Sequence, residues 1–244
     1  MTEPASSPRS SRDSAAELRE KKRVLAALVV HDLRSPLSAI QGYLQLLREE
    51  LADDQRPVAL AYLDDATTLV GKALSLVATI LDVDELEDGI LRAHRQPTKI
   101  LELVERARAG NRAHLEVRQL HFDLRCDPHL TANIDRDLFA RVVENLLDNA
   151  SRYAPRGGRV AVHAHRQGAY TEIAVGNNGP PVPAIDREAI FGRYFQVEAR
   201  RASARANRGL GLYFCKLAVE AHGGTLHVEE RRELGAVFVV RVAE

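Results

Sequence analysis

The stretch Leu28-Val-Val-His-Asp-Leu-Arg-Ser-Pro-Leu-Ser-Ala-Ile40 places a histidine beside a carboxylate inside an otherwise apolar segment. Apolar residues recur here in alternating steps of four and three, the spacing of a helix that packs against other helices. His31 follows Val30 of this series, so we expect its ring at the flank of the packed seam, within reach of water and of a second protein. A single histidine in a helix is ordinary by itself. The series is Ala26, Val30, Leu33, Leu37, Ile40, Leu44, Leu47 and Leu51.

Two long helices are predicted for the first third of the chain. The first runs from about residue 15 to Leu51, with a bend at Pro36, and a turn follows over Asp53 to Pro57. Two such helices joined by a short turn form an antiparallel hairpin, and each is apolar over more than one stripe. We therefore expect two hairpins to pair into a dimeric four-helix bundle through Ala15 to Leu86. The second apolar series is Leu60, Leu63, Thr67, Val70, Leu74, Val77 and Leu81.

Composition excludes several classes of protein. The 244 residues carry 34 basic and 34 acidic side chains, so nothing in the overall charge points to nucleic acid or to an anionic membrane. Cys126 and Cys215 are far apart and lack partners at metal-ligand spacing, which argues against a disulfide framework or a zinc site. No apolar run reaches the roughly 20 residues that span a bilayer, and residues 2–12 lack the apolar core of a signal peptide. We expect a cytoplasmic protein with no membrane span in this chain.

Beyond residue 88 the pattern changes from helical periods to short runs between turns. The lapse at Asp88-Gly89 and at Gln96-Pro97 predicts a linker, and helices alternating with mainly antiparallel strands predict an α/β sandwich. The irregular stretch from Gly179 to Asn207 predicts a lid or a binding element. The expected helices are Thr98 to Ala109, Asp135 to Tyr153 and Leu210 to His222; the expected strands are His114 to Arg125, His129 to Ile134, Gly158 to Arg166, Tyr170 to Val175, Thr225 to Glu230 and Ala236 to Val242, the last two joined by a turn at Gly235.

The expected fold class is therefore α+β, with a helical hairpin that forms a dimeric bundle followed by an α/β sandwich. Its predicted divisions are a disordered lead over residues 1–14, the helical domain over 15–88, the linker over 89–97 and the sandwich over 98–244. The lead is rich in Ser, Pro and charge and has little to bury.

A polar pattern marks one face of the predicted helix that ends at Tyr153. Asn145, Asp148, Asn149 and Arg152 recur at steps of three and four. A solvated helix face is the ordinary explanation, but amides are mediocre helix formers with no structural reason to repeat here. Amide oxygens ligate Mg²⁺ and an arginine holds phosphate oxygens, so this face fits a nucleotide site. The opposite, packing face holds Val142, Val143, Leu146, Leu147 and Ala150.

Three further segments each have an ordinary explanation when taken alone. Val175 to Pro183 is a strand that ends in a Gly and Pro turn, and Ile190 to Phe195 is an aromatic and basic cluster that would anchor the long loop. Arg208-Gly-Leu-Gly-Leu212 is a glycine pair that opens a helix, where backbone amides and the helix dipole favour a phosphate. A lone G-x-G pattern is weak, because glycine turns before helices are common.

In this order, the clusters resemble those of a sensor histidine kinase of the two-component type. In that family a histidine-containing dimerisation and phosphotransfer domain precedes a catalytic ATP-binding domain shared with gyrase-type ATPases. The resemblance covers Ala15 to Val242, and five boxes in register are far more specific than any one of them. The segments look like the H box (His31 to Leu37), the N box (Glu144 to Tyr153), the G1 box (Val175 to Pro183), the F box (Ile190 to Phe195) and the G2 box (Arg208 to Leu212).

The resemblance implies autophosphorylation of His31 by ATP and transfer of the phosphoryl group to an aspartate in the receiver domain of a response regulator. Asp32 would hydrogen-bond the other ring nitrogen or take its proton, and Arg193 or Arg208 would stabilise the transferring group. The implied cofactors are ATP and Mg²⁺, with Asn149 as the metal ligand. The implied nucleotide-binding set is Asn145, Asn149, Arg152, Tyr153, Asn177, Gly179, Arg208, Gly209, Leu210 and Gly211, in which Arg152 contacts phosphates, Tyr153 borders the adenine, and Gly209 and Gly211 allow close approach to the phosphates.

The G1 segment departs from the family pattern Asp-x-Gly-x-Gly. Asn177 stands at the position of the aspartate that accepts a hydrogen bond from the adenine amino group, and Pro181 replaces the second glycine. Asn207 also replaces the leading glycine of the G2 box. A neutral acceptor is weaker than a carboxylate, so the resemblance implies reduced ATP affinity rather than none.

Three functions stay open at this point. The first is an active histidine kinase. The second is a degenerate relative that binds partners through the helix bundle and serves as a phosphotransfer or scaffold protein without using ATP. The third is a phosphatase toward the regulator, for which Ser35 would orient the hydrolytic water, less well than an amide or threonine would. A serine kinase of the anti-sigma type, which shares the ATP fold, would leave the H box unexplained. With only 30 residues before His31, we expect the signal to arrive through a separate sensor or input protein, through the helix bundle or through parts outside this chain.

Overall fold

The computed structural model describes residues 32–33, 35–47, 49, 56–87, 91–193, 195 and 210–243. The chain divides into two compact units, Met1–Ile80 and Leu81–Glu244. His31, Arg208 and Gly209 lie outside the described residues, as does the predicted lead over residues 1–14.

The first unit contains the described part of the first predicted helix and most of the second. Residues 35–47 are helical, and α2 extends over Arg56–Glu87, its last turns lying in the second unit. The rings of Tyr43 and Tyr62 join the two helices, with centroids 5.9 Å apart. The predicted turn through Pro57 is wrong at its end, because Arg56 and Pro57 already belong to α2. Proline suits the first turn of a helix, where its missing N–H has no partner to lose.

Among the side chains of α2 whose burial is described in this unit, alanines are buried while two large apolar residues are exposed. Its buried positions include Ala59, Ala66 and Ala73, which are spaced by seven residues. Leu63 and Val70, also seven apart and each 43% exposed, belong to the predicted apolar series. The single chain therefore leaves large apolar side chains of the heptad seam in contact with water. Leu37, Leu44 and Leu46 of the first helix are exposed in the same way.

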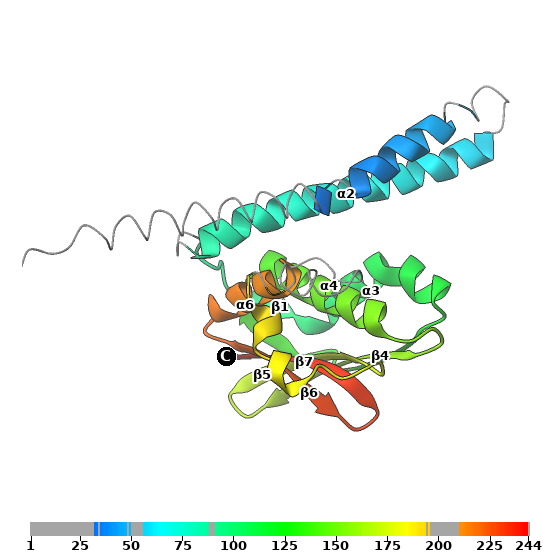
Figure 1. Ribbon diagram of the computed structural model, residues 1–244. Helices are drawn as coiled ribbons and strands as arrows, with labels where there is room; N and C mark the ends of the chain where they lie inside the picture. The colour runs from blue at the N-terminus through cyan, green and yellow to red at the C-terminus, as the bar shows by residue number, and fades with distance from the viewer. Residues whose placement is uncertain are drawn as a thin grey trace, which may run out of the picture. The chain divides into compact units, whose positions relative to one another are not determined.

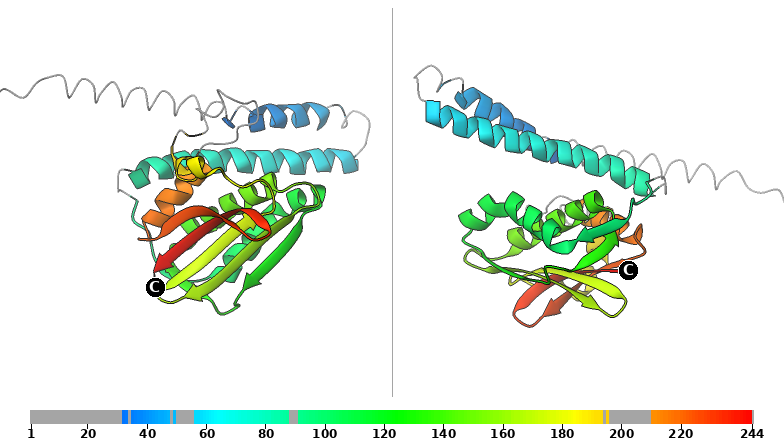
Figure 2. Two further views of the ribbon diagram at one scale, coloured as in Figure 1. Left: turned by 60° about the horizontal axis from the view of Figure 1, so that its bottom comes forward. Right: turned by 180° about the vertical axis from the view of Figure 1, so that it is seen from behind.

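The second unit is an α/β sandwich whose helices cover one face of a five-stranded sheet (Figure 1). The strand order is β2-β4-β5-β7-β6, and β1 and β3 form a separate antiparallel pair. Figure 2 shows α3, α4 and α6 on the same side of the sheet, and none of these three helices lies on its other face. The elements are β1 (Gln96–Lys99), α3 (Ile100–Val117), β2 (His121–Cys126), β3 (Thr131–Ile134), α4 (Arg136–Tyr153), β4 (Arg159–Gln167), β5 (Tyr170–Asn177), η1 (Ala184–Asp186), η2 (Ala189–Phe191), α6 (Gly211–Glu220), β6 (Thr225–Arg231) and β7 (Leu234–Ala243).

Strand alternation separates the two faces of this sheet. Ile173 and Val175 of β5 belong to the main core, which packs against the helices, whereas Ala174 belongs to a smaller apolar cluster with Val237 and Val239. That second cluster is buried although none of α3, α4 and α6 covers it. Long charged side chains lie over this face instead. The buried carboxylate of Glu172 accepts hydrogen bonds from Arg231 and Arg241, each at 2.9 Å, and this holds the two arginine side chains across the face.

Several predicted boundaries are wrong. The segment Gln96–Lys99 was expected to join a linker to a helix but forms β1, an edge strand that tolerates Pro97. Helix α3 continues to Val117, so the strand expected from His114 begins only at His121, and β2 pairs with β4 in the parallel sense. The turn expected at Gly235 lies before it, since β7 begins at Leu234.

The expected positions of several helices and strands are confirmed. The helix from Asp135, the hairpin of β4 and β5, and the final pair β6 and β7 lie where the pattern placed them, within a few residues. Both cysteines are free thiols, Cys215 buried and Cys126 half-buried. None of the helices in the described part of the chain combines the length and apolarity that a bilayer crossing requires.

Candidate functional site

Helix α4 carries the predicted nucleotide-binding face, and its N-terminal end is firmly held. The Asp135 carboxylate accepts hydrogen bonds from the backbone N–H groups of Asp137 and Leu138, both at 3.1 Å, and caps the helix. The N–H of Asp135 donates to Nε2 of His222 at 2.9 Å, and Nδ1 of His222 lies 2.6 Å from the carbonyl of Ala218. This end of α4 is thereby tied to the end of α6.

The protonation state of His222 follows from these contacts. Because Nε2 accepts a hydrogen bond, the proton resides on Nδ1 and the ring is neutral. Burial, above all, lowers the pKa of His222; the Ala218 carbonyl opposes this, the positive charge of Arg95 adds to it and Asp135 opposes it. The ring also meets Phe139 edge to face, with centroids 4.8 Å apart. The arrangement is a structural tie rather than a reactive site.

The two faces of α4 divide as the sequence predicts. The predicted packing residues are all buried in the main core. Each such large apolar side chain contributes roughly 1.5–3 kcal/mol relative to exposure. The four polar residues of the opposite face, Asn145, Asp148, Asn149 and Arg152, are all half-buried. Burial of the apolar face thus fixes which way the amides and the charges are presented.

Asn145 is directed toward the start of α6. Its amide nitrogen donates to the carbonyl of Arg141 at 2.9 Å, which fixes the orientation of the side chain. A β-carbon added to Gly211, the first residue of α6, would lie 2.8 Å from Oδ1 of Asn145. A side chain at this position would make Asn145 shift, and among the described residues no side chain caps the N-terminus of α6. Uncapped N–H groups and the helix dipole at this point favour an anion.

Asn149 and Arg152 differ in how far they are engaged. Within the described residues, the amide of Asn149 makes no hydrogen bond, so its oxygen is available to a ligand. Arg152 instead donates to Asp148 at 2.6 Å, one turn before it. The Nε atom of Arg152 is buried without a partner among the described residues. The predicted contact of Arg152 with phosphates would therefore compete with an existing ion pair.

The C-terminal end of α4 is held by a residue that sequence reasoning missed. Arg118, in the turn after α3, donates to the carbonyl of Ala154 at 2.8 Å and also to the carbonyls of Ser151 and Arg152. These are carbonyls that a helix end leaves without partners. No local signal identifies Arg118, because it is more than 30 residues from the helix end that it binds.

The G1 segment lies against this same end of α4. A β-carbon added to Gly179 would lie 2.1 Å from the carbonyl oxygen of Tyr153 and 2.7 Å from Oδ1 of Asn177, so the loop passes too close for any other residue. Gly235 of β7 is required for the same reason, since its added β-carbon would lie 1.9 Å from the Gly179 carbonyl oxygen. The structure thus brings Tyr153, Asn177 and Gly179 together.

Two buried polar groups in this region lack partners. Asn177 is 1% exposed at the end of β5, and its Oδ1 accepts the N–H of Gly179 at 2.7 Å. Its Nδ2 has no hydrogen-bond partner among the described residues, and neither has the hydroxyl of Ser151, which is fully buried on α4. Buried polar groups are nearly always paired, so unpaired ones mark places where something else binds.

The F-box residues anchor the loop, as their composition suggests. Phe191 is buried and meets Phe238 of β7 edge to face, with ring centroids 6.2 Å apart. Arg193 forms an ion pair with Glu87, which also accepts a hydrogen bond from the hydroxyl of Tyr213. In this structure the guanidinium expected to stabilise a transferring group is engaged by the last residue of α2.

The predicted catalytic residues of the first unit are only partly described. Asp32 is helical and half-buried, and Ser35 is helical and exposed. His31, Arg208 and Gly209 lie outside the described residues, while Leu210 is buried just before α6.

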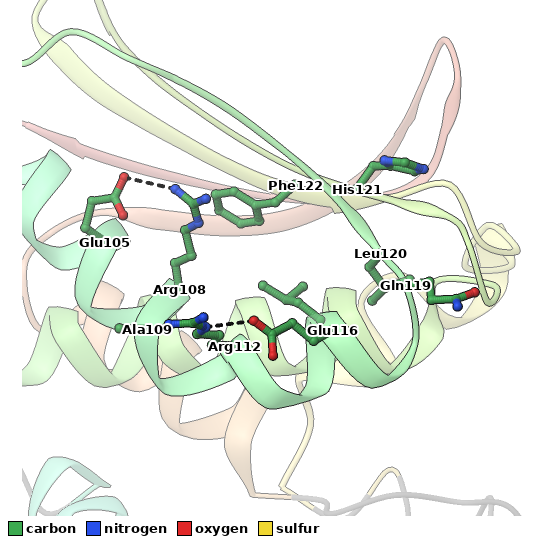
Figure 3. Close-up of a pocket in the computed structure, with 10 residues that line it drawn as sticks. Glu105, Arg108, Ala109, Arg112, Glu116, Gln119, Leu120, His121 and Phe122 are labelled. Carbon is green, nitrogen blue, oxygen red and sulfur yellow. Dashed lines mark hydrogen bonds and ion pairs between the residues drawn. The ribbon is translucent and has the colours of Figure 1, made fainter.

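A separate cavity lies between α3 and β2 (Figure 3) and holds about 640 Å³. None of the predicted site residues lines it. The guanidinium of Arg108 lies over the ring of Phe122, 5.0 Å from its centroid, and Arg112 pairs with Glu116 at 2.7 Å. Its charged side chains are therefore already neutralised by one another or stacked on an aromatic ring.

The residues present fit a nucleoside triphosphate. The uncapped start of α6 suits phosphates, the free amide of Asn149 suits a hard cation such as Mg²⁺, and the unpaired groups of Asn177 and Ser151 suit a polar base. No cluster of three or more His, Cys, Asp or Glu side chains in the described residues forms a metal site by itself.

Fold and site together define an ATPase-type sandwich preceded by a helical hairpin, and two family matches agree with this. Residues 134–244 match the "Histidine kinase-, DNA gyrase B-, and HSP90-like ATPase" family, and residues 21–89 match the "His Kinase A (phospho-acceptor) domain". Residues 134–244 thus form an ATPase domain of the histidine kinase type, and residues 21–89 match a histidine phospho-acceptor domain.

Several proteins of known identity are similar to this chain. The sensor protein SrrB of Staphylococcus aureus (strain NCTC 8325 / PS 47) is 25% identical over 227 residues, which are 92% of this chain and 38% of SrrB. The chain thus spans well under half the length of this relative. The structure of full-length ShkA in complex with AMPPNP has a TM-score of 0.62 at 23% identity, covering 90% of this chain and 45% of ShkA. Histidine kinase ThkA in complex with response regulator protein TrrA has a TM-score of 0.58 at 20% identity, covering 98% and 68%.

Proposed function

We propose that the chain is an ATP-dependent protein-histidine kinase that phosphorylates His31 and passes the phosphoryl group to an aspartate of a response regulator. The observation that carries the proposal is the approach of Asn145 on α4 to Gly211 at the uncapped start of α6. This places the amide face of one helix against the anion-binding end of another, as a triphosphate site requires. The complexes of ShkA with AMPPNP and of ThkA with TrrA support the same function for relatives of this fold.

The proposed reaction has two steps. A ring nitrogen of His31 attacks the γ-phosphorus of ATP, the bond from that phosphorus to the bridging oxygen breaks, and ADP leaves. Asp32, which follows His31 directly, accepts the imidazole proton. A carboxylate of the regulator then attacks the phosphorus, the P–N bond breaks, and His31 is regenerated.

Charge neutralisation accompanies the first step. Mg²⁺, when bound, offsets the charge of the β- and γ-phosphates, and we assign Asn149 as its protein ligand. Asn145 holds its orientation through the Arg141 carbonyl and supports the same region. Arg193 can reach a phosphate only after it leaves Glu87, so this ion pair opposes the transfer until it opens.

We further propose that the protein is a homodimer through its helical hairpin and acts in the cytoplasm, where ATP and response regulators meet. Leu37 and Leu44 on the first helix, and Leu63 and Val70 on α2, expose large apolar surfaces at heptad spacing. A second hairpin would cover them, because knobs at this spacing fit the holes of a facing helix. The dimer is thus a four-helix bundle.

One experiment tests the kinase and the dimer together. The chain is incubated with γ-labelled ATP and Mg²⁺, and the label is tested for acid lability, which distinguishes phosphohistidine from phosphoserine. We expect acid-labile labelling that His31→Gln abolishes, while sedimentation shows that this variant remains a dimer. Asn149→Ala, which removes the metal ligand but no hydrogen bond seen in the described residues, should reduce the labelling rate at least about a hundredfold.

The outcomes separate the alternatives. Undiminished labelling of the His31→Gln variant would overturn the assignment of His31. A dimer that takes up no label would favour the phosphotransfer or scaffold protein. Asn177 gives this second candidate its support, because a neutral amide replaces the family carboxylate. Sedimentation as a monomer at micromolar concentration would overturn the dimer.

A further inference from the structure

The side chain of Asn177 presents a buried hydrogen-bond donor at the position where the resemblance places the contact with the base. Asn177 has the same strand parity as Ile173 and Val175, so it lies on the face of β5 that packs against the helices. It is 1% exposed, and Gly179 places its amide beside the C-terminal end of α4, at the Tyr153 carbonyl. The group lies at the end of the sandwich where Ser151 also leaves a buried hydroxyl unpaired.

The orientation of this amide is set by the backbone. The N–H of Gly179 lies 2.7 Å from Oδ1, and a backbone N–H only donates, so the atom that faces it must be the carbonyl oxygen. The NH₂ group is consequently at the other end of the amide. It is buried and finds no acceptor among the described residues. A buried donor without an acceptor is costly, and a bound ligand that supplies a carbonyl oxygen would remove the cost.

Purine bases differ in what they offer to such a donor. Adenine carries an amino group at position 6, which is itself a donor, whereas guanine carries a carbonyl oxygen there, which accepts. Hypoxanthine has the same carbonyl and lacks the 2-amino group of guanine. A hydrogen-bond donor at this position therefore complements the 6-oxo group of guanine or hypoxanthine. With adenine, two donors would face each other and no hydrogen bond would form between them.

We propose that this site accepts 6-oxopurine nucleoside triphosphates at least as well as ATP, with the NH₂ group of Asn177 donating to the carbonyl oxygen at position 6. The proposal rests on the proposed function, in that a nucleoside triphosphate binds between α4 and α6. It makes Asn177 a residue that determines base specificity. ATP retains binding through its phosphates but gains nothing from the Asn177 donor.

Competition binding on the full chain tests the proposal. A fluorescent purine nucleotide is displaced by ATP, ITP or GTP in the presence of Mg²⁺, and ITP isolates position 6 because it carries no 2-amino group. We expect ITP to bind as tightly as ATP or more tightly. In the Asn177→Asp variant the carboxylate still accepts the Gly179 N–H but repels the 6-oxo group. The ratio of ITP affinity to ATP affinity should then fall at least tenfold.

Asn178→Asp is the matched control. It makes the same chemical change one residue further on, where the side chain is exposed and its Oδ1 accepts the N–H of Arg159 at 2.7 Å. This control should leave the ratio unchanged, and thermal unfolding without nucleotide should show both variants folded. Tenfold tighter binding of ATP than of ITP to the native chain, or an unchanged ratio in Asn177→Asp, would overturn the proposal. Failure of every nucleotide to bind would instead overturn the proposed function beneath it.

Discussion

The two ends of helix α4 are built in opposite ways. At the N-terminal end the Asp135 carboxylate accepts three backbone N–H groups, including that of His94 at 2.9 Å, and the Asp135 N–H is itself bound by His222. At the C-terminal end Arg118 binds the last carbonyls, but buried groups of Ser151 and Asn177 find no partner among the described residues. One end is saturated with internal hydrogen bonds and the other keeps buried hydrogen-bonding capacity unused.

This difference separates scaffold from site. A saturated end contributes stability and has nothing to offer a ligand, whereas unpaired buried groups lower stability until a ligand pairs them. Substitutions at the N-terminal end should therefore change the free energy of unfolding and leave nucleotide affinity alone. Substitutions that remove an unpaired group at the C-terminal end should instead lower nucleotide affinity, and they should raise rather than lower the free energy of unfolding.

The largest effect is expected from Asp135→Ala. The change leaves three N–H groups without their acceptor and removes the N-cap of α4, so the free energy of unfolding should fall by about 2 kcal/mol. Urea unfolding measures this, and nucleotide affinity measured under folding conditions should stay within about twofold. Asp137→Ala is the control, because this exposed first-turn carboxylate loses only its interaction with the helix dipole, worth at most about 1 kcal/mol. An equal decrease in the free energy of unfolding in the two variants would show that the hydrogen bonds of Asp135 add nothing to stability.

A smaller, pH-dependent effect is expected from His222. Burial lowers its pKa below the ordinary value of 6.5, so the unfolded chain takes up a proton at higher pH than the folded chain does. The stabilisation is complete above about pH 6.5 and is lost as the pH falls from there through the lowered pKa. Stability should therefore decrease on acidification through this window, measured by urea unfolding at successive pH values.

The control for this pH dependence is another histidine. His129 is exposed and only its backbone N–H is hydrogen-bonded, to Asp127. His222→Gln should flatten the slope of stability against pH, while His129→Gln should leave it unchanged. A slope that survives the His222 substitution would assign the effect to other groups.

Much of the fold can be predicted from local sequence patterns, and where these predictions are wrong there is a physical cause. The burial of Leu146 and Leu147 was predictable because a helical period places them on one face, and that burial sets the direction of the polar face. Strand β1 was missed because Pro97 signals a break, yet an edge strand tolerates it. Gly235 was assigned to a turn, but its role is a close approach to Gly179, which only the folded chain reveals. The turn itself falls at Glu233, which adopts a φ of +68°.

The residues of the candidate site likewise fall into those that local patterns identify and those that only the folded chain reveals. Asn145 and Asn149 were found because they repeat on one helical face, and Gly211 because glycine before a helix is a recognisable signal. Arg118 and Ser151 were missed, since the first acts across more than 30 residues and the second shows its importance only as a buried hydroxyl without a partner. Asn177 departs from a sequence pattern, but only the geometry shows that its oxygen accepts a hydrogen bond from Gly179 while its NH₂ group makes none among the described residues.

The smallest effect is expected from Ser151→Ala, and its sign is what matters. Removing a fully buried hydroxyl that has no partner among the described residues should raise the free energy of unfolding of the nucleotide-free chain by about 1 kcal/mol, part of it from the better helix propensity of alanine. Propensity alone cannot alter ligand binding, so nucleotide affinity is the decisive second measurement. If the hydroxyl is kept for the ligand, affinity should fall several-fold while stability rises. A gain in stability with unchanged affinity would mean that the C-terminal end of α4 is merely imperfect, and that the contrast between the two ends does not mark the site.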